Sequence, residues 1–171
     1  MARVRAEDPG DREAIAAVHV AAFPTAAEAR LVDALRAAGR LSVSLVAEVE
    51  GRIVGHVALS PVELAGASRG AGLAPVAVLP GFRRRGIAER LVREGLAACE
   101  RSGCGFVVVL GEPAYYARFG FLPAARFGLR DEYAGGDAFQ ALELRAGALP
   151  GGGGDVRYAL EFAALGAASG A

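Results

Sequence analysis

The chain has 171 residues and a formal net charge of zero, and its 19 basic residues are all arginine. The absence of lysine excludes Schiff-base catalysis and lysine-containing phosphate loops, while two histidines and two cysteines are too few for a thiolate-rich zinc site. The balanced charge disfavours a general nucleic-acid binder, and without a signal peptide or an apolar span of about 20 residues we expect one cytoplasmic domain, residues 1–171, with reduced thiols.

The first part of the chain predicts an edge strand followed by two helices. Val4 lies in a short segment that suits an edge strand. Asp8 and Pro9 are typical of a helix start, and apolar residues then recur at helical spacing. A capping box that begins at Thr25 predicts a second helix, which Gly39 ends.

The middle of the chain predicts strands around one long helix. From Leu41 onward apolar and polar residues alternate, and Glu50-Gly51 predicts a turn between two antiparallel strands. Residues 73–79 are apolar on both faces, as in a central strand, and residues 106–110 repeat that pattern. Between them, residues 86–102 have the wide apolar face of a helix, so the two strands are expected to be parallel.

The last part predicts a short helix and further strands. Glu112-Pro113 begins the helix, which carries three aromatic residues before Gly120 ends it. Residues 139–144 alternate as a strand, 151–154 form a glycine turn, and 158–162 are expected to form a last strand. The whole pattern indicates a mixed α/β fold.

The segment most informative about function joins the central strand to the long helix. It reads Arg83-Arg84-Arg85-Gly86-Ile87-Ala88. The first N–H groups of a helix have no intrahelical acceptor and carry partial positive charge, so this junction predicts an anion site. Arginine adds bidentate donors. Two alternatives are a solvated turn and a nucleic-acid contact through Phe82 and the arginines, and the zero net charge disfavours the second.

The same hexapeptide resembles the acyl-CoA loop of the GCN5-related N-acetyltransferase (GNAT) superfamily, whose pattern is [Gln/Arg]-x-x-Gly-x-[Gly/Ala]. Residues 116–121 resemble the Tyr-x-x-x-Gly-Phe on the last helix of that superfamily, and residues 110–116 look like one bacterial subgroup of predicted N-acetyltransferases. The resemblance covers residues 3–162. It implies a central, mostly antiparallel sheet of six to seven strands with about four helices, in which a splayed parallel strand pair holds the cofactor.

The resemblance also implies an activity. The expected enzyme transfers the acetyl group of acetyl-CoA, as co-substrate, to a primary amine of a small molecule or peptide by direct attack on the thioester. It implies no metal, no nucleic-acid or membrane partner, and a monomer or homodimer. The alternative is an acyl-CoA-binding sensor or interaction module without turnover.

Specific residues acquire roles from this resemblance. The backbone of residues 76–78 would pair with the pantetheine arm, and N–H groups of residues 84–88 would bind the pyrophosphate. Tyr116 would be the general acid that protonates the departing thiolate, since a phenol of pKa about 10 is protonated at neutral pH. Phe119 would lie along the cofactor. The cofactor-binding residues so implied are Val76, Ala77, Val78, Arg83, Arg84, Arg85, Gly86, Ile87, Ala88 and Phe119.

Two points stay open at the level of sequence. The general base is Glu63, Glu112, His56 or water. Many members of the superfamily carry an asparagine after the strand that precedes the tyrosine, whereas this chain has no asparagine and reads Gly111-Glu112-Pro113 there. Tyr115 is paired with Phe119 at helical spacing and is expected to pack on the sheet.

Overall fold

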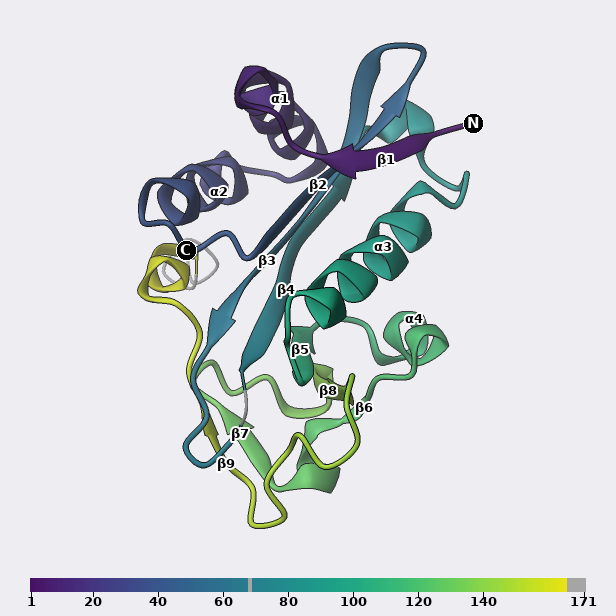
Figure 1. The fold of residues 1–171 in the computed structure, drawn as a ribbon. Coiled ribbons are helices and arrows are strands. Elements are labelled where there is room, and N and C mark those ends of the chain that lie inside the picture. The colour runs from purple at the N-terminus through teal and green to yellow at the C-terminus, as the bar shows by residue number, and fades with distance from the viewer. Residues whose placement is uncertain (68, 166–171) are drawn as a thin grey trace.

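A seven-stranded sheet forms the centre of the computed structural model, which describes residues 1–67 and 69–165 (Figure 1). All neighbouring strands are antiparallel except β4 and β5. The predicted mixed α/β fold with one parallel pair is therefore confirmed. In spatial order the strands are β1 (Arg3–Ala6), β2 (Val43–Val49), β3 (Arg52–Val62), β4 (Gly70–Val78), β5 (Phe106–Leu110), β8 (Phe139–Glu143) and β6 (Leu122–Pro123).

Helices cover both faces of the sheet (Figure 1). One face carries α1 (Arg12–Ala22) and α2 (Ala27–Ala37), and the other carries α3 (Ile87–Arg101), with the short α4 (Pro113–Tyr116) after β5. Successive side chains of β3 point alternately toward these two helical layers. Val57 lies against Gly95 of α3, whereas His56 contacts His19 of α1.

The parallel pair is short, and this shapes the sheet. Strands β4 and β5 pair only from Gly70 opposite Phe106 to Gly72 opposite Val108. The register of β3 with β4 shifts between Val57 and Leu59, at the level where β4 leaves β5. Beyond that level the two strands diverge, and the last residues of β4 border a gap in the sheet.

Two local predictions were wrong. Helix α2 begins at Ala27, so Thr25 is not its N-cap; the Thr25 hydroxyl instead accepts a hydrogen bond from the Ala27 N–H at 3.2 Å. Residues 158–162 are not a strand. The last strand is β9 (Gly154–Val156), parallel to β7 (Leu129–Asp131), and Leu160–Phe162 forms a 3-10 turn. The spacing of Tyr158 and Phe162 also fits one helical turn, and their rings pack with centroids 5.2 Å apart.

The end of α3 allows a stability prediction. Gly103 follows the helix with φ +95°, a conformation that costs residues with a Cβ about 1–2 kcal/mol. A Cβ there would meet no atom closer than 3.9 Å, so strain alone sets the cost. We expect Gly103→Ala to lower the free energy of unfolding by about 1 kcal/mol in urea titrations. Gly10→Ala, in open space without a positive φ, is the control; equal stability of the two variants would contradict this explanation.

Candidate functional site

The loop before α3 has the backbone geometry of an anion site. Gly86 is the N-cap of α3 and has φ +75°, and Arg84 has φ +62°, uncommon for a residue with a side chain. The first helical hydrogen bond runs from the Arg90 N–H to the Gly86 carbonyl, at 3.0 Å. The N–H groups of residues 87–89 therefore have no acceptor within the helix and lie at its positive end.

A pocket of about 290 Å³ opens beside this helix start, between the end of β4, the beginning of α3 and α4. Most residues of the predicted acyl-CoA loop line it, together with Val78 from β4. Four lining residues, Phe82, Glu89, Tyr115 and Arg118, are not among the predicted cofactor residues, and Tyr115 and Arg118 form the side of the pocket near α4. The lining residues are Val78, Phe82, Arg83, Arg84, Gly86, Ile87, Ala88, Glu89, Tyr115 and Arg118.

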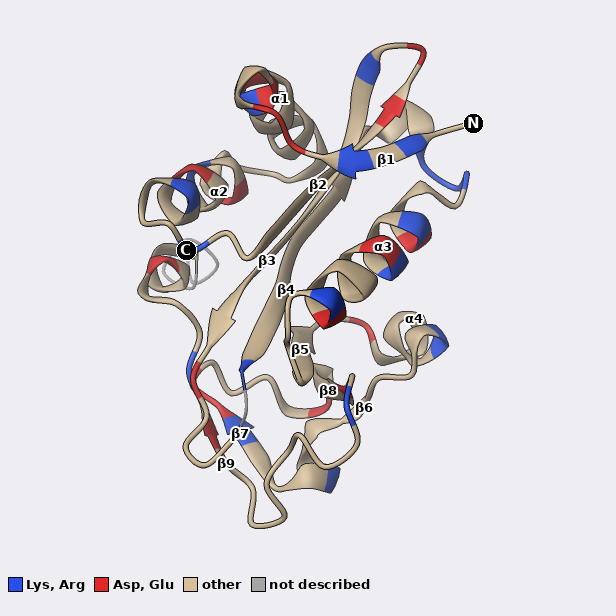
Figure 2. Ribbon diagram, in the orientation of Figure 1, with Lys and Arg blue, Asp and Glu red and all other residues tan. Residues whose placement is uncertain are grey.

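The charges around the pocket suit an anion. Arg83, Arg84 and Arg118 contribute three cations, and the one carboxylate on the lining, Glu89, is paired with Arg118 at 3.5 Å and with Arg93 at 3.0 Å. Figure 2 shows the arginine segment between β4 and α3 as a blue stretch. The excess of positive charge favours a phosphate-bearing ligand.

Arg85 is directed elsewhere, although it was predicted as a cofactor residue. Its guanidinium lies over the Phe82 ring, 5.1 Å from the centroid, and Arg52 lies over the same ring at 5.7 Å. Arg85 does not line the pocket. In this arrangement its side chain stabilises the loop through Phe82.

The end of β4 offers unpaired backbone groups to the gap. The Leu79 N–H donates to the Val54 carbonyl at 2.8 Å. Antiparallel alternation then turns the polar backbone groups of Ala77 toward β3 and those of Val76 and Val78 toward the gap. Of the three predicted pantetheine positions, Val76 and Val78 thus have groups free to bind an extended ligand, while Ala77 has its side chain on the α1 face.

Tyr116 lies beside the end of β5 and does not line the pocket. It is 8% exposed, and its ring packs against those of Tyr115, Phe119 and Phe121 with centroids 5.1, 6.1 and 5.7 Å away. Its ring edge lies against Gly111, the residue that follows β5. Burial raises the pKa of Tyr116 to about 12, so the phenol keeps its proton at neutral pH.

Tyr115 and Phe119 pack against each other, as predicted, with ring centroids 5.5 Å apart. Tyr115 lines the pocket rather than only packing on the sheet; its hydroxyl is buried and has no hydrogen-bond partner among the described residues, and Arg118 lies over its ring at 4.4 Å. Phe119 is 9% exposed, belongs to the core next to the pocket and carries Arg93 over its ring at 5.0 Å.

The position directly after β5 has no room for a side chain such as asparagine. A Cβ placed on Gly111 would lie 2.4 Å from the Tyr116 ring, so no side chain fits at that position in the present packing. A buried amide from β8 lies there instead: the Gln140 Nε2 donates to the carbonyls of Gly111 and Ala138, both at 3.2 Å. Nothing in the sequence around Gln140 indicated this role.

The three side chains considered as general base lie in different settings. Glu63 is exposed, and its backbone pairs with that of Arg157. Glu112 is exposed and caps α4 by position only, without a side-chain hydrogen bond. His56 is fully buried; one ring nitrogen lies 2.8 Å from the Ser44 hydroxyl and the other 2.8 Å from a ring nitrogen of His19.

The remaining sequence features are structural. Cys99 and Cys104 are free and buried, as predicted. Within residues 1–67 and 69–165, no group of three or more potential metal ligands occurs, and no helix is long and apolar enough to cross a membrane.

Known proteins match this chain over most of its length. The family described as "Acetyltransferase (GNAT) family" matches residues 12–121. The N-acetyltransferase YhbS of Escherichia coli K12 is 43% identical over 162 residues, which is 93% of this chain and 97% of YhbS, and YjhQ of the same strain is 37% identical over 69% of this chain and 68% of YjhQ.

Solved structures of related proteins have the same fold. A crystal structure of Escherichia coli YhbS in complex with CoA superimposes with a TM-score of 0.90 at 42% identity, covering 95% of this chain and 92% of that one. A GNAT-family acetyltransferase from Brucella melitensis in complex with acetyl-CoA superimposes with a TM-score of 0.80 at 39% identity, covering 95% and 98%.

Proposed function

Because this chain belongs to the GNAT family of acetyltransferases, we propose that it binds acetyl-CoA in the pocket at the start of α3 and transfers the acetyl group to a primary amine of a small molecule or peptide. The observation that carries this proposal is the left-handed Gly86 at a helix start beside a gap in the sheet. Two close relatives with the same fold hold CoA or acetyl-CoA in their structures.

The cofactor would follow the polar groups just described. Its pyrophosphate would accept hydrogen bonds from the free N–H groups at the start of α3, with Arg83 and Arg84 supplying charge. Its pantetheine arm would run along the end of β4 and pair with the backbone of Val76 and Val78. The thioester would then lie in the gap, near Tyr116.

The proposed reaction is a direct transfer. The amine nitrogen forms a bond to the thioester carbon, the carbon–sulfur bond breaks, and the electron pair stays on sulfur. Tyr116 donates its proton to that sulfur, and the amine nitrogen releases one proton to solvent. The tyrosinate regains a proton from water, so the products are an N-acetylated amine and CoA with a free thiol.

A panel of primary amines, amino acids and short peptides, incubated with acetyl-CoA while free thiol is measured, tests the proposal. We expect thiol release that depends on both the protein and one class of amine. Acetyl-CoA binding without amine-dependent thiol release across the panel would instead favour an acyl-CoA sensor. The panel also identifies the acceptor, and gel filtration of the same protein distinguishes a monomer from a homodimer.

A charge placed at the start of α3 tests the pocket itself. Ala88 lines it, and a glutamate there would repel the pyrophosphate from a few ångströms away. We expect Ala88→Glu to weaken acetyl-CoA binding about 100-fold in calorimetric titration, which corresponds to about 2.7 kcal/mol. Ala97→Glu, on the same helix and outside the pocket, is the matched control. Similar affinities of the two variants would argue against this pocket as the cofactor site.

A further inference from the structure

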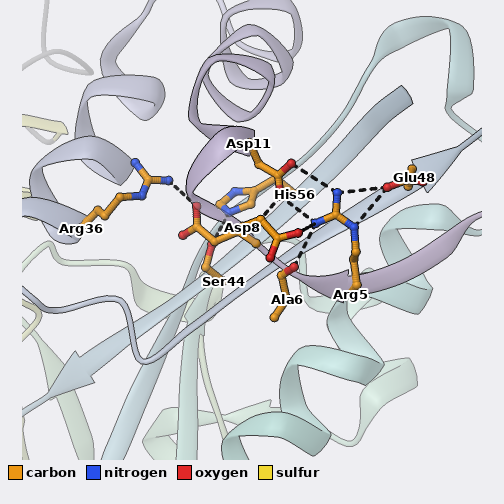
Figure 3. A network of polar contacts seen from close by, with 9 residues as sticks. Arg5, Ala6, Asp8, Asp11, Arg36, Ser44, Glu48 and His56 are labelled. Carbon is orange, nitrogen blue, oxygen red and sulfur yellow. Dashed lines mark hydrogen bonds and ion pairs between the residues drawn. The ribbon is translucent and has the colours of Figure 1, made fainter. Parts of the chain in front are cut away.

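Three polar side chains, two of them fully buried, form a hydrogen-bonded chain from α1 to β2. The Nε2 atom of His19 on α1 lies 2.8 Å from the Nδ1 atom of His56 on β3, and the Nε2 atom of His56 lies 2.8 Å from the hydroxyl of Ser44 on β2. Both imidazoles are 0% exposed. Figure 3 shows His56 and Ser44 next to the ion pairs of Arg5 and Arg36.

The hydrogen bonds between these three side chains can run in either of two directions. In one, His19 donates to His56 and His56 donates to Ser44; in the other, Ser44 donates to His56 and His56 donates to His19. The His19 Nδ1 atom, buried and without a partner among the described residues, is a bare acceptor in the first and an unpaired N–H in the second. A proton taken up at that atom converts the first arrangement into the second and releases a proton at Ser44.

The hydrogen-bonded chain of His19, His56 and Ser44 lies on the face of the sheet opposite the pocket. Ala77 of β4 is the cross-strand partner of His56, so both side chains point toward α1, whereas Val57, the next residue of β3, points toward α3. With the cofactor on the α3 face, as proposed above, an acceptor amine would approach the thioester from the α1 face. Helix α1 contacts both β3 and β4, so His19 and His56 lie on this face, with β4 between His56 and the gap.

The other end of the hydrogen-bonded chain lies nearer the surface. Ser44 is half-buried, and its carbonyl accepts a hydrogen bond from the Glu7 N–H at 3.1 Å. Glu7 lines an open pocket of about 420 Å³ with Asp8, Pro9, Arg12 and Arg36. The Glu7 carboxylate, 2.8 Å from the Arg36 guanidinium, therefore lies in an open pocket next to the strand that carries Ser44.

We propose that His19, His56 and Ser44 form a relay that carries the proton of the acceptor amine from the gap to the open pocket at Glu7. The proposal rests on the proposed acetyl transfer. As the carbon–nitrogen bond forms, the nitrogen becomes more acidic, and its proton passes to Nδ1 of His19, directly or through one water. His19 passes its Nε2 proton to His56, His56 passes its Nε2 proton to Ser44, and the Ser44 hydroxyl proton leaves to water.

The surroundings keep both imidazoles neutral and able to accept a proton. Burial lowers the pKa of His19 to about 4, and burial, with the charges of His19 and Arg36, lowers the pKa of His56. The charged groups that face the pair come from α2, where Arg36 is paired with Asp33 at 2.6 Å, and from the β1–α1 connection, where Glu7 binds Arg36. In this proposal His19 faces the acceptor, whereas His56 and Ser44 act through His19 and are positioning residues.

The test uses the full chain, acetyl-CoA and the best amine of the panel, with kcat measured from pH 6 to 9. We expect His56→Gln and Ser44→Ala to lower kcat about 10- to 100-fold at pH 7 and less at pH 9, where free amine and hydroxide replace the relay. The KM for acetyl-CoA should change by less than about threefold. Ser44→Thr keeps the hydroxyl and should restore the wild-type pH profile.

Ser60→Ala is the matched control. Ser60 is a buried serine on the same strand face as His56, and it takes no part in the hydrogen bonds of the proposed relay. Parallel pH profiles of Ser44→Ala, Ser60→Ala and the wild type would overturn the relay while leaving acetyl transfer intact. Ser44→Ala is mild enough to decide this even where His56→Gln does not fold. A wild-type protein that binds acetyl-CoA and acetylates no amine would instead overturn the proposed function, and the relay with it.

Discussion

Replacing Tyr116 with phenylalanine is expected to lower kcat about 100- to 1,000-fold while acetyl-CoA binding stays nearly unchanged. The substitution removes one hydroxyl from a ring that is already enclosed by aromatic neighbours, so the packing is kept. Without the phenol, CoA must leave as an unprotonated thiolate. Because burial raises the pKa of Tyr116 to about 12, the wild-type acid should stay active throughout pH 6 to 9. Steady-state kinetics with the best acceptor measures the loss.

Tyr115→Phe is the matched control for this prediction. The two tyrosines are adjacent, but only Tyr115 lines the pocket, and its hydroxyl is buried without a partner among the described residues. We expect its removal to change acetyl-CoA affinity more than kcat. A large loss of kcat in Tyr115→Phe with none in Tyr116→Phe would transfer the role of the acid to Tyr115.

Acid is expected to destabilise the protein well before its carboxylates are protonated. His19 has a pKa of about 4 in the folded state, against about 6.5 in an unfolded chain. Between these values the unfolded state binds more protons, so the free energy of unfolding falls as pH decreases from about 6.5 to about 4 and is fully retained above pH 6.5. The difference for His19 is about 3 kcal/mol, and His56 shifts in the same direction.

Urea titrations at several pH values between 7.5 and 4.5 measure this loss. Replacing both histidines with leucine should flatten the dependence of the unfolding free energy on pH in that window. The Arg5–Asp11 pair does not obscure the result, because Arg5 lowers the pKa of Asp11 and its contribution is lost only at more acidic pH. A double variant with the same pH slope as the wild type would show that other groups cause the acid sensitivity.

The elements that sequence reasoning placed correctly are those with a strong local signal. Helix α3 has a continuous apolar face and glycine at both ends, and β4 and β5 are apolar on both faces. The turn at Glu50-Gly51 and the edge strand around Val4 also agree with the structure. The loop from Arg83 to Ala88 could be predicted because its chemistry depends on the backbone of one short segment.

The rest depends on contacts between distant segments. His19 and His56 are 37 residues apart in the chain and meet only when α1 packs on β3. The pocket wall contributed by Tyr115 and Arg118 depends on how α4 turns after β5. The C-terminal turn was mistaken for a strand because Tyr158 and Phe162 fit both periods, and only their packing against each other distinguishes the two.

The fate of the acetyl group tests the central proposal most directly. Acetyl-CoA labelled in its acetyl group is incubated with the protein and the best amine of the panel, and the products are identified by mass spectrometry. Direct transfer predicts that the label appears in the N-acetylated amine in a one-to-one ratio with released thiol, and that Ala88→Glu forms far less of this product. Labelled free acetate with unmodified amine, or label that remains in acetyl-CoA, would contradict the proposed transferase.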